Sequence, residues 1–303
     1  MIEYGIVVHG GAGAPLEISD GCVAACSVGF ALLEGGGSAL DAATAAVRTM
    51  EDDGRFNAGT GSVLRLDGKT REMDAAVMDS KKNLGIVISL QGFRNPVLVA
   101  RAVMATPHVA LSGNGAANFA KMRGFDPLDP SIPETILERC RKIKQLLESP
   151  EKLGKEYPSW QGSDMGTLWN FDDRPPKDVL LCDTVGAVAL DRDGLLAVAS
   201  STGGASPMLM GRVGDTAMAG CGFFAGSLAA IAVTGLGEEM IRNMTARTVY
   251  DHVAGGETIE EACAKVVASF PSPVPVGIIG ISRTGHGVWA NRTLPCHVLV
   301  SPP

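Results

Sequence analysis

Aromatic and basic residues are both scarce in this sequence. Phenylalanine, tryptophan and tyrosine make up 5% of its 303 residues, too few to build a surface on which bases stack. Its 26 lysines and arginines are outnumbered by 33 aspartates and glutamates, which gives a formal net charge of −7. A nucleic-acid partner requires clustered basic residues that neutralise phosphates. The composition therefore predicts that the protein has no nucleic-acid partner.

Long apolar runs and paired cysteines are missing as well. No apolar run reaches the roughly 18–20 residues that span a bilayer. The first residues, MIEYGIVVHGG, lack the basic region and the cleavage site of a signal peptide. The seven cysteines are an odd number and form no CxxC motif, which is typical of reduced thiols. We therefore expect a cytoplasmic protein with no membrane partner.

The motifs of several common enzyme classes are also absent. The glycine-rich stretch HGGAGAP at 9–15 has neither the spacing of a dinucleotide fingerprint nor the ending of a P-loop. The five histidines form no HExxH or other metal-ligand spacing, and no serine lies in a GxSxG motif. Nothing near Cys182 in the sequence would activate it as a thiol nucleophile. The sequence thus predicts no cofactor and no metal site made of side chains, and the glycine-rich stretch reads as a tight turn close to a site.

The order of the expected elements indicates the fold class. Hairpins are expected at 61–79, 183–201 and 276–293. Helices are expected at 19–35, 38–53, 95–105, 133–151 and 258–270. Strands in hairpins and helices mostly in pairs favour antiparallel sheets stacked between helix layers over a doubly wound parallel sheet. Residues from about 149 to 178 break every periodicity and predict a mobile linker.

Local signals mark the ends of several elements. Asp67-Gly68 supplies the positive φ of a tight hairpin turn. Asn95, just before a proline, is expected to cap the helix at 95–105. Thr258 and Glu261 stand in the order of a capping box at the start of the helix at 258–270.

One threonine holds an unusual position. Thr184 follows Asp183 at the start of a strand and directly after the predicted linker. Threonine is common in buried strands, so β-propensity alone could explain it. Alternatively, Thr184 attacks the carbonyl of Asp183, and hydrolysis of the resulting ester frees an α-amine that titrates near 7.7–8.0 and can act as its base. The spacing alone leaves both interpretations open.

Eight short motifs make the chain resemble a known family. They are VVHGGAG (7–13), FNAGTGSVL (56–64), MDAAVMD (73–79), NPVLVAR (95–101), DTVGAVALD (183–191), STGG (201–204), GRVGDT (211–216) and TGLGE (234–238). In this order and at these separations, they resemble the plant-type L-asparaginases with isoaspartyl peptidase activity, which are N-terminal nucleophile hydrolases. The segment at about 149–178 and the tail after Trp289 match nothing in that pattern.

The resemblance implies a fold and a processing event. The fold would be an α+β, four-layer αββα sandwich formed by one domain over 1–303. Autocleavage between Asp183 and Thr184 would give an α chain of 1–183 and a β chain of 184–303, and two such αβ units would form a dimer. A structural sodium ion would be held by backbone carbonyls of the loop from Glu51 to Phe56. The glycine-rich stretch would lie near the scissile bond and influence processing.

The resemblance also implies the roles of several site residues. Thr184 would be the nucleophile, with Thr202 as its hydroxyl partner and Asn57 positioning it. Thr234 and the N–H of Gly235 would form the oxyanion hole, where backbone donors suit the charge that develops in the tetrahedral intermediate. Gly235 and Gly237 would line the substrate pocket.

Arg212 and Asp215 fit a small zwitterionic substrate on physical grounds. An arginine can grip an α-carboxylate bidentately, and an aspartate accepts hydrogen bonds from an α-amine. Without the resemblance, a surface ion pair would be the better explanation of the two residues. With it, we expect hydrolysis of L-asparagine, or of β-aspartyl dipeptides, as small-molecule substrates.

Three alternatives remain open on the sequence. A glycosylasparaginase typically carries Thr-Asn-Gly where this chain has Thr202-Gly203-Gly204. A non-processing homologue would only bind small amino acids. The chain could also be a structural domain without activity, in which case the match to the motifs would be a coincidence. Cys182, where relatives usually carry histidine or glycine, could alter the cleavage rate.

Overall fold

The computed structural model describes residues 1–132, 134, 136–138, 168, 170 and 184–302. The predicted helix at 133–151 and the predicted linker at 149–178 lie almost wholly outside these residues. Cys182 and Asp183 lie outside them too, so the scissile bond is described from Thr184 onward.

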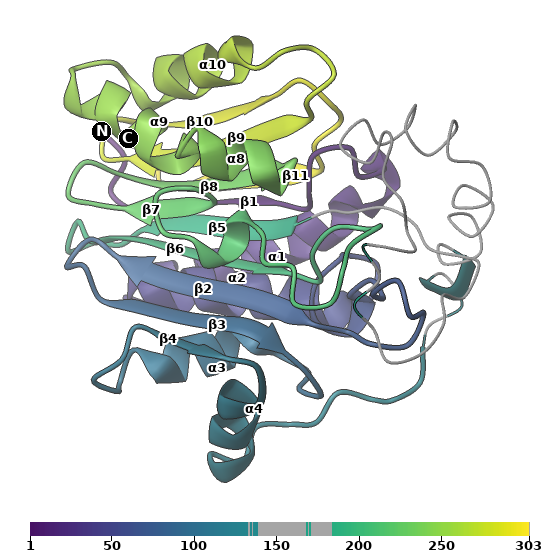
Figure 1. Ribbon diagram of the computed structural model, residues 1–303. Coiled ribbons are helices and arrows are strands. Elements are labelled where there is room, and N and C mark those ends of the chain that lie inside the picture. Colours follow the sequence, from purple (N-terminus) through teal and green to yellow (C-terminus); the bar gives the residue numbers. More distant parts are fainter. Residues whose placement is uncertain (133, 135, 139–167, 169, 171–183, 303) are drawn as a thin grey trace.

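A seven-stranded sheet forms the centre of the molecule (Figure 1). Its strand order is β11-β1-β5-β6-β2-β3-β4, and every pairing is antiparallel except that of β3 with β4. The strands are β1 (Gly5–His9), β2 (Met73–Asp79), β3 (Leu84–Leu90), β4 (Ala110–Ser112), β5 (Thr184–Leu190), β6 (Leu196–Thr202) and β11 (Cys296–Val300). The two termini lie side by side, because Ser301 Oγ accepts the backbone N–H groups of Glu3 and Tyr4.

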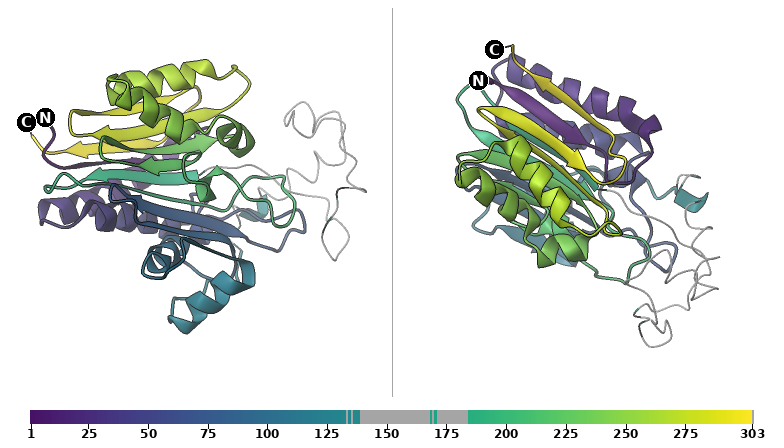
Figure 2. Two further views of the ribbon diagram at one scale, coloured as in Figure 1. Left: turned by 60° about the vertical axis from the view of Figure 1, so that its left-hand side comes forward. Right: turned by 90° about the horizontal axis from the view of Figure 1, so that it is seen from above.

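A second sheet packs against this one, and helices cover the outer face of each (Figure 2). The second sheet has the order β10-β9-β8-β7, with β7 (Phe223–Ala225), β8 (Ala229–Gly235), β9 (Val276–Ser282) and β10 (Gly285–Ala290). Helices α1 (Ser19–Glu34), α2 (Ala39–Asp53), α3 (Pro96–Val103) and α4 (Gly113–Met122) cover the larger sheet. Helices α9 (Thr245–Ala254) and α10 (Ile259–Ser269) cover the smaller one. The predicted αββα sandwich is confirmed.

The alternation of side chains along β5 separates the two cores. Val185, Ala187 and Ala189 face the helices, whereas Val188 and Leu190 face the second sheet. Because side chains alternate along a strand, the same even-numbered face carries Thr184 and Gly186 into the space between the sheets.

The predicted hairpins are confirmed except for the first. Residues 276–290 and 184–202 form antiparallel pairs, the second turning at Asp191–Leu195. At 61–79 the turn forms at Gly68, but only β2 is a strand, and it pairs with β3 and β6. The reason is that Val63 N–H donates to Asn57 and Arg65 N–H donates to the Thr70 carbonyl, so these backbone groups do not pair with β2.

The unmatched C-terminal tail completes the sheet. It supplies β11, which pairs with β1 along its whole length. Just before β11, the carbonyls of Thr293 and Pro295 accept the N–H groups of Gly13 and Gly10 at 2.7 and 2.8 Å. The tail therefore holds the glycine-rich stretch in place.

One helical stretch among the described residues is long and apolar enough to cross a membrane, contrary to the sequence expectation. Leu16–Glu34, a stretch of 19 residues that joins η1 (Leu16–Ile18) to α1, contains an 18-residue window with a mean hydropathy of 1.6. Length and composition are its only membrane-like features, and a core helix of a soluble protein meets the same criteria. Here one side of α1, including Cys22, Ala25 and Cys26, is buried against the large sheet.

The start of α3 is capped by a residue that the sequence did not indicate. Asn95 is the N-cap residue and Pro96 the first residue of the helix, as predicted, but the Asn95 side chain makes no cap hydrogen bond and instead donates to Asp52. Glu51 Oε1 accepts the N–H of Val97 at 3.0 Å. Glu51 is fully buried, and this burial raises its pKa to about 8, although nearby donors from Ser201, Val97 and Asn95 oppose the shift.

We expect stability to fall with rising pH through Glu51. Its pKa lies near 8 in the fold and at an ordinary 4.5 in the unfolded chain. Between these values the folded chain holds a proton that unfolding releases, so each pH unit costs about 1.4 kcal/mol. In a Thr184→Ala background, which keeps the chain whole, adding Glu51→Gln should flatten urea-unfolding stability between roughly pH 5.5 and 7.5. A matched change at exposed Glu17 should leave the slope intact; equal slopes in all three proteins would contradict the prediction.

Candidate active site

Thr184 and Thr202 face each other across the β5–β6 hairpin. They are direct partners in the ladder, and Thr184 Oγ1 donates to Thr202 Oγ1 at 3.2 Å. Thr202 Oγ1 also accepts the N–H of Gly204 at 3.0 Å. Both threonines are buried between the sheets. A hydroxyl held this way can serve as a nucleophile once a base removes its proton.

Thr234 and Gly235 end β8 in the opposite sheet, on the same side of the molecule. A Cβ built on Gly186 of β5 would lie 3.0 Å from the Cβ of Ala232 in β8. The two strands are therefore in contact at a point two residues away from Thr184 on β5 and two residues away from Thr234 on β8. Thr234 Oγ1 accepts the N–H of Ala12 at 3.2 Å. Gly235 has a φ of 151°, and any Cβ there would meet the Pro275 carbonyl at 2.2 Å. The site therefore joins the two sheets and the glycine-rich stretch.

His9 lies beside the candidate nucleophile as a neutral ring. Burial lowers its pKa to about 3, while the backbone of Thr184 acts in the opposite direction. A Cβ on Gly186 would approach His9 Nε2 to 2.4 Å. His9 also pairs with Gly186 across β1 and β5. Hence glycine at 186 makes room for the imidazole, and the glycine-rich stretch lies next to Thr184, as predicted.

Asn57 supports the strand that carries Thr202. Its Nδ2 donates to the Gly204 carbonyl at 2.7 Å, and its own carbonyl accepts the N–H of Gly203 at 2.9 Å. Its Oδ1 accepts the N–H of Val63 at 2.9 Å. These bonds place Asn57 behind the end of β6, next to Thr202.

Arg212 uses one edge of its guanidinium on a neighbouring glutamate. Its Nε and Nη2 donate to the two carboxylate oxygens of Glu238 at 2.9 and 2.8 Å. Burial would raise the pKa of Glu238, but the hydrogen bonds and charge of Arg212 outweigh it and hold that pKa below its usual value. Glu238 belongs to α8 (Gly237–Arg242), so it ties Arg212 to the end of β8.

Asp215 presents a buried carboxylate oxygen that lacks a hydrogen-bond partner among the described residues. This atom is Oδ2, and burial raises the pKa of the carboxyl to about 7 against the opposing charge of Arg212. A Cβ on Gly237 would lie 2.7 Å from Arg212 Nη2 and 2.9 Å from Asp215 Oδ1. The structure thus brings Arg212, Asp215 and Gly237 together, and Asp215 is poised to accept from a cation.

The register of the strands links this group to the threonines. Asp74 of β2 is the ladder partner of Thr202, and it faces the same way. Burial raises the pKa of Asp74, and the charges of Arg65 and Arg212 oppose that shift. Thr184, Thr202 and Asp74 therefore lie in a row across β5, β6 and β2, and Asp74 at its end interacts electrostatically with Arg212.

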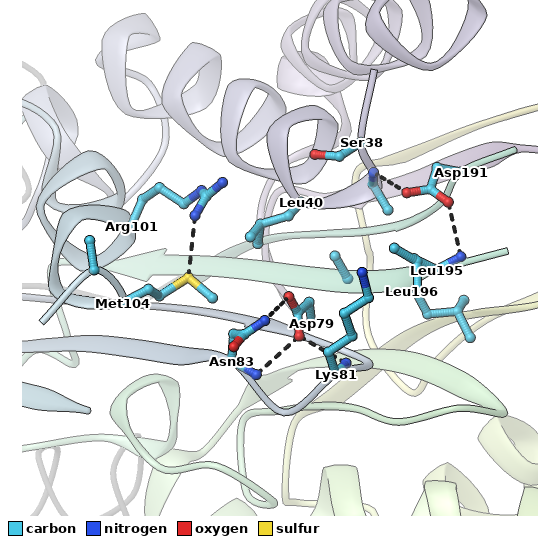
Figure 3. Close-up of a pocket in the computed structure, with 13 residues that line it drawn as sticks. Ser38, Leu40, Asp79, Lys81, Asn83, Arg101, Met104, Asp191, Leu195 and Leu196 are labelled. Atoms are coloured by element: carbon cyan, nitrogen blue, oxygen red, sulfur yellow. Dashed lines mark hydrogen bonds between the residues drawn. The ribbon is translucent and has the colours of Figure 1, made fainter. Parts of the chain in front are cut away.

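A cavity of about 340 Å³ lies elsewhere (Figure 3). It sits beside Asp191, at the other end of β5 from Thr184, a distance of roughly 20 Å along the strand. The carboxylates in its wall hold backbone in place: Asp191 accepts the N–H groups of Ala39 and Leu195, and Asp79 accepts those of Lys81 and Asn83. This cavity is separate from the candidate active site.

Sequence reasoning missed several residues of the site. Glu238 is the last residue of the TGLGE motif at 234–238, and this place in a recognised motif was the signal that could have found it. Its contact with Arg212, which lies 26 residues earlier, had no signal in the sequence. His9 was treated as one structural histidine among five. The burial of Arg65, Glu72 and Asp74 had no signal in a stretch that reads as a polar hairpin. In the part of the chain that the structure describes, no group of three His, Cys, Asp or Glu side chains could hold a metal.

Comparisons with known proteins agree with the motifs. The asparaginase family matches residues 2–298. A human protein named isoaspartyl peptidase/L-asparaginase is 38% identical over 303 residues, covering 96% of this chain and 91% of the relative. The Macaca fascicularis protein of the same name matches equally, at 38% over the same coverage. A plant-type L-asparaginase of Pyrococcus furiosus is 39% identical over 307 residues, with 95% and 93% covered.

Proposed function

Because the chain belongs to the asparaginase family of N-terminal nucleophile hydrolases, we propose that it is a self-cleaving amidohydrolase that acts on L-asparagine, on β-aspartyl dipeptides or on both. The observation that carries the proposal is the Thr184–Thr202 hydroxyl pair at 3.2 Å, in a site that also holds an Asp215 oxygen without a hydrogen-bond partner among the described residues. The names of the relatives supply the substrate classes.

Activation would proceed by an acyl shift. Thr184 Oγ1 attacks the carbonyl carbon of Asp183, the peptide C–N bond breaks, and the amine of Thr184 takes up the proton. Water then hydrolyses the ester, leaving a carboxylate on Asp183 and a free hydroxyl and α-amine on Thr184. The neutral His9 ring lies fully buried beside the Thr184 backbone.

The mature site would use the new amine as general base. Near its ordinary pKa of about 7.7–8.0, part of this amine is free base at neutral pH. Oγ1 then attacks the side-chain amide carbon, and the Thr234 hydroxyl and Gly235 N–H stabilise the oxyanion. Ammonia, or the amine of the second residue in a dipeptide, leaves, and water releases aspartate from the acyl-enzyme.

Arg212 and Asp215 would bind the two charged groups of the substrate. Glu238 binds the Nε–Nη2 edge of Arg212 and orients the guanidinium, whose charge would attract the α-carboxylate. The α-ammonium would donate to Asp215 Oδ2, which has no other partner among the described residues. A charge-assisted bond of this kind offsets the cost of burying the carboxylate.

Intact mass spectrometry with product assays tests the proposal. Purified protein should resolve into two fragments that meet between Asp183 and Thr184, and the product should release ammonia from asparagine and aspartate from β-aspartyl dipeptides. Cleavage of N-acetylglucosaminyl-asparagine alone would instead support a glycosylasparaginase. A whole, inactive chain that still binds aspartate would point to the binding-only homologue.

We expect Gly237→Ala to weaken substrate binding. Its methyl group would lie 2.7 Å from Arg212 Nη2 and 2.9 Å from Asp215 Oδ1, so one of the two groups must move. A displacement of this size should raise KM by about 10- to 100-fold. Gly115→Ala, where a Cβ meets nothing within 4 Å, is the control in steady-state assays. An unchanged KM in Gly237→Ala would place the substrate elsewhere.

We further propose that the loop from Glu51 to Phe56 holds sodium. A Cβ on Gly61 would meet the carbonyl oxygens of Phe56 and Gly54 at 2.0 and 2.6 Å, and one on Gly59 would meet that of Glu51 at 2.7 Å. Several backbone oxygens therefore face this glycine-rich turn, and they are the donors that hard cations prefer. Such an ion would stabilise the loop leading to Asn57. The melting temperature should be higher in sodium chloride than in choline chloride of equal ionic strength; equal values would argue against the ion.

The compartment and the assembly complete the proposal. All five cysteines in the described residues are free thiols, which suits a reducing cytoplasm. A dimer of αβ units would follow from family membership. Sedimentation of the mature protein would distinguish such a dimer from a single αβ unit.

A further inference from the structure

A buried ion pair lies beneath the loop that carries Arg212 and Asp215. Arg65 Nε donates to Glu72 Oε2 at 2.7 Å, and the two side chains are 0% and 6% exposed. Burial lowers the pKa of Arg65, but the charges of Glu72 and Asp74 counter this, and an arginine keeps its proton even so. The pair therefore places two opposite charges inside the protein, joined by a hydrogen bond of fixed direction.

Both members of the pair also bind the backbone of the loop. Glu72 Oε2 accepts the N–H of Gly211 at 2.7 Å, and Arg65 Nη2 donates to the carbonyl of Arg212 at 3.4 Å. Gly211 has a φ of 74°, and a Cβ built there would find no heavy atom within 4 Å. On that side the turn has no packing contact with the described residues, whereas hydrogen bonds from the ion pair hold the peptide group before Gly211 and the peptide group after Arg212.

The pair also contacts the segment between β6 and the loop. Arg65 Nη1 contacts Met208 Sδ, and a Cβ on Gly204 would come within 2.9 Å of the same nitrogen. Gly204 is the residue whose carbonyl binds Asn57. The guanidinium therefore connects the end of the strand that carries Thr202 with the loop that carries Arg212.

We propose that Arg65 and Glu72 are positioning residues for substrate recognition, which set the place of Arg212 and Asp215 relative to Thr184. A buried ion pair often adds no more stability than an apolar pair of the same size. Its directional bonds, however, fix backbone groups that an apolar pair would leave loose. The proposal rests on the proposed function, because it concerns the groups that would bind the α-carboxylate and the α-amine.

The double variant Arg65→Met, Glu72→Gln tests this directly. It removes both members of the pair at similar volume, so neither of them stays buried without the other. If the pair positions the loop, KM for asparagine should rise by about 10- to 100-fold while kcat changes by less than about threefold. Arg192→Met with Glu3→Gln removes an exposed pair of the same type and should leave both constants unchanged. If the double variant does not fold, Arg65→Lys is the alternative test. It keeps the charge but loses the planar set of N–H donors, so it should give a smaller rise in KM.

Hydrogen–deuterium exchange separates this proposal from the proposed function. Peptides covering 208–216 should exchange faster in the double variant, whether or not the protein hydrolyses asparagine. If the wild-type protein has no activity but the double variant exchanges faster, the proposed function would be wrong. The role of the pair in positioning the loop would still be supported. Unchanged exchange together with an unchanged KM would overturn the positioning role. A fall in kcat at constant KM would overturn it as well, because the pair would then act on the chemical step.

Discussion

Thr184→Ala should remain a single chain and lose at least about four orders of magnitude in kcat, as expected when the nucleophile of a covalent mechanism is removed. The reason is that one hydroxyl would serve twice, first on the carbonyl of Asp183 and then on the substrate. Alanine keeps the backbone of β5 and its pairing with β6. Intact mass over several days and ammonia release from asparagine are the measurements.

Thr184→Ser is the matched control for that change. It keeps a hydroxyl within reach of Thr202 and, after cleavage, an α-amine, so it should still process and retain measurable turnover. Processing of the alanine variant at the same bond would show that Thr184 is not the nucleophile. A whole alanine chain with full activity would mean that cleavage and catalysis are unconnected.

Asp215→Asn should lower kcat/KM by about 10²- to 10³-fold, mainly through KM. An amide offers an uncharged oxygen, and its NH₂ group repels an ammonium. In the wild type the pKa of Asp215 is about 7, so the carboxylate becomes protonated as the pH falls through neutrality and KM should rise. In Asp215→Asn, KM should no longer rise at low pH. Measurements of kcat and KM between roughly pH 5.5 and 8.5 would detect this difference.

A control variant and the separate effect of the Thr184 amine would show that the change in KM comes from Asp215. Asp193→Asn removes the same charge from an exposed turn at the far end of β5 and should leave KM unchanged. The Thr184 α-amine also titrates near neutrality, but as the base it should affect kcat. A KM that keeps its rise at low pH in Asp215→Asn would assign that rise to another group.

The threonine pair was predictable because it depends on local geometry. Thr184 and Thr202 each lie nine residues from Asp193, so a tight hairpin with its turn there places them opposite one another. Alternation along β5 and β6 then directs both to the same face. The sandwich followed from the same kind of reasoning, since strands in hairpins and paired helices leave few arrangements.

The contacts that the sequence did not predict join segments distant in the chain. Glu51 caps α3 in place of Asn95, and Arg65 with Glu72 forms a buried pair where the sequence suggests a polar hairpin. Which charges become buried depends on which segments meet, and periodicity carries no information about that. The C-terminal tail matched no motif, yet its backbone forms a sheet edge, because main-chain pairing places few demands on side chains.

The strand order of the large sheet bears on what happens after cleavage at Thr184. Strand β1 lies between β11 and β5, and β6 lies beside β2, so strands from before the scissile bond pair with strands from after it at three places in the sheet. The two fragments would be held together by main-chain hydrogen bonds on both sides of β1, and neither could leave without opening the sheet. Once denatured, they would have to find each other by diffusion, so refolding of the mature protein would be second order in protein, whereas that of the precursor is first order. Maturation would thus turn a fold that one chain reaches alone into one that two chains must reach together.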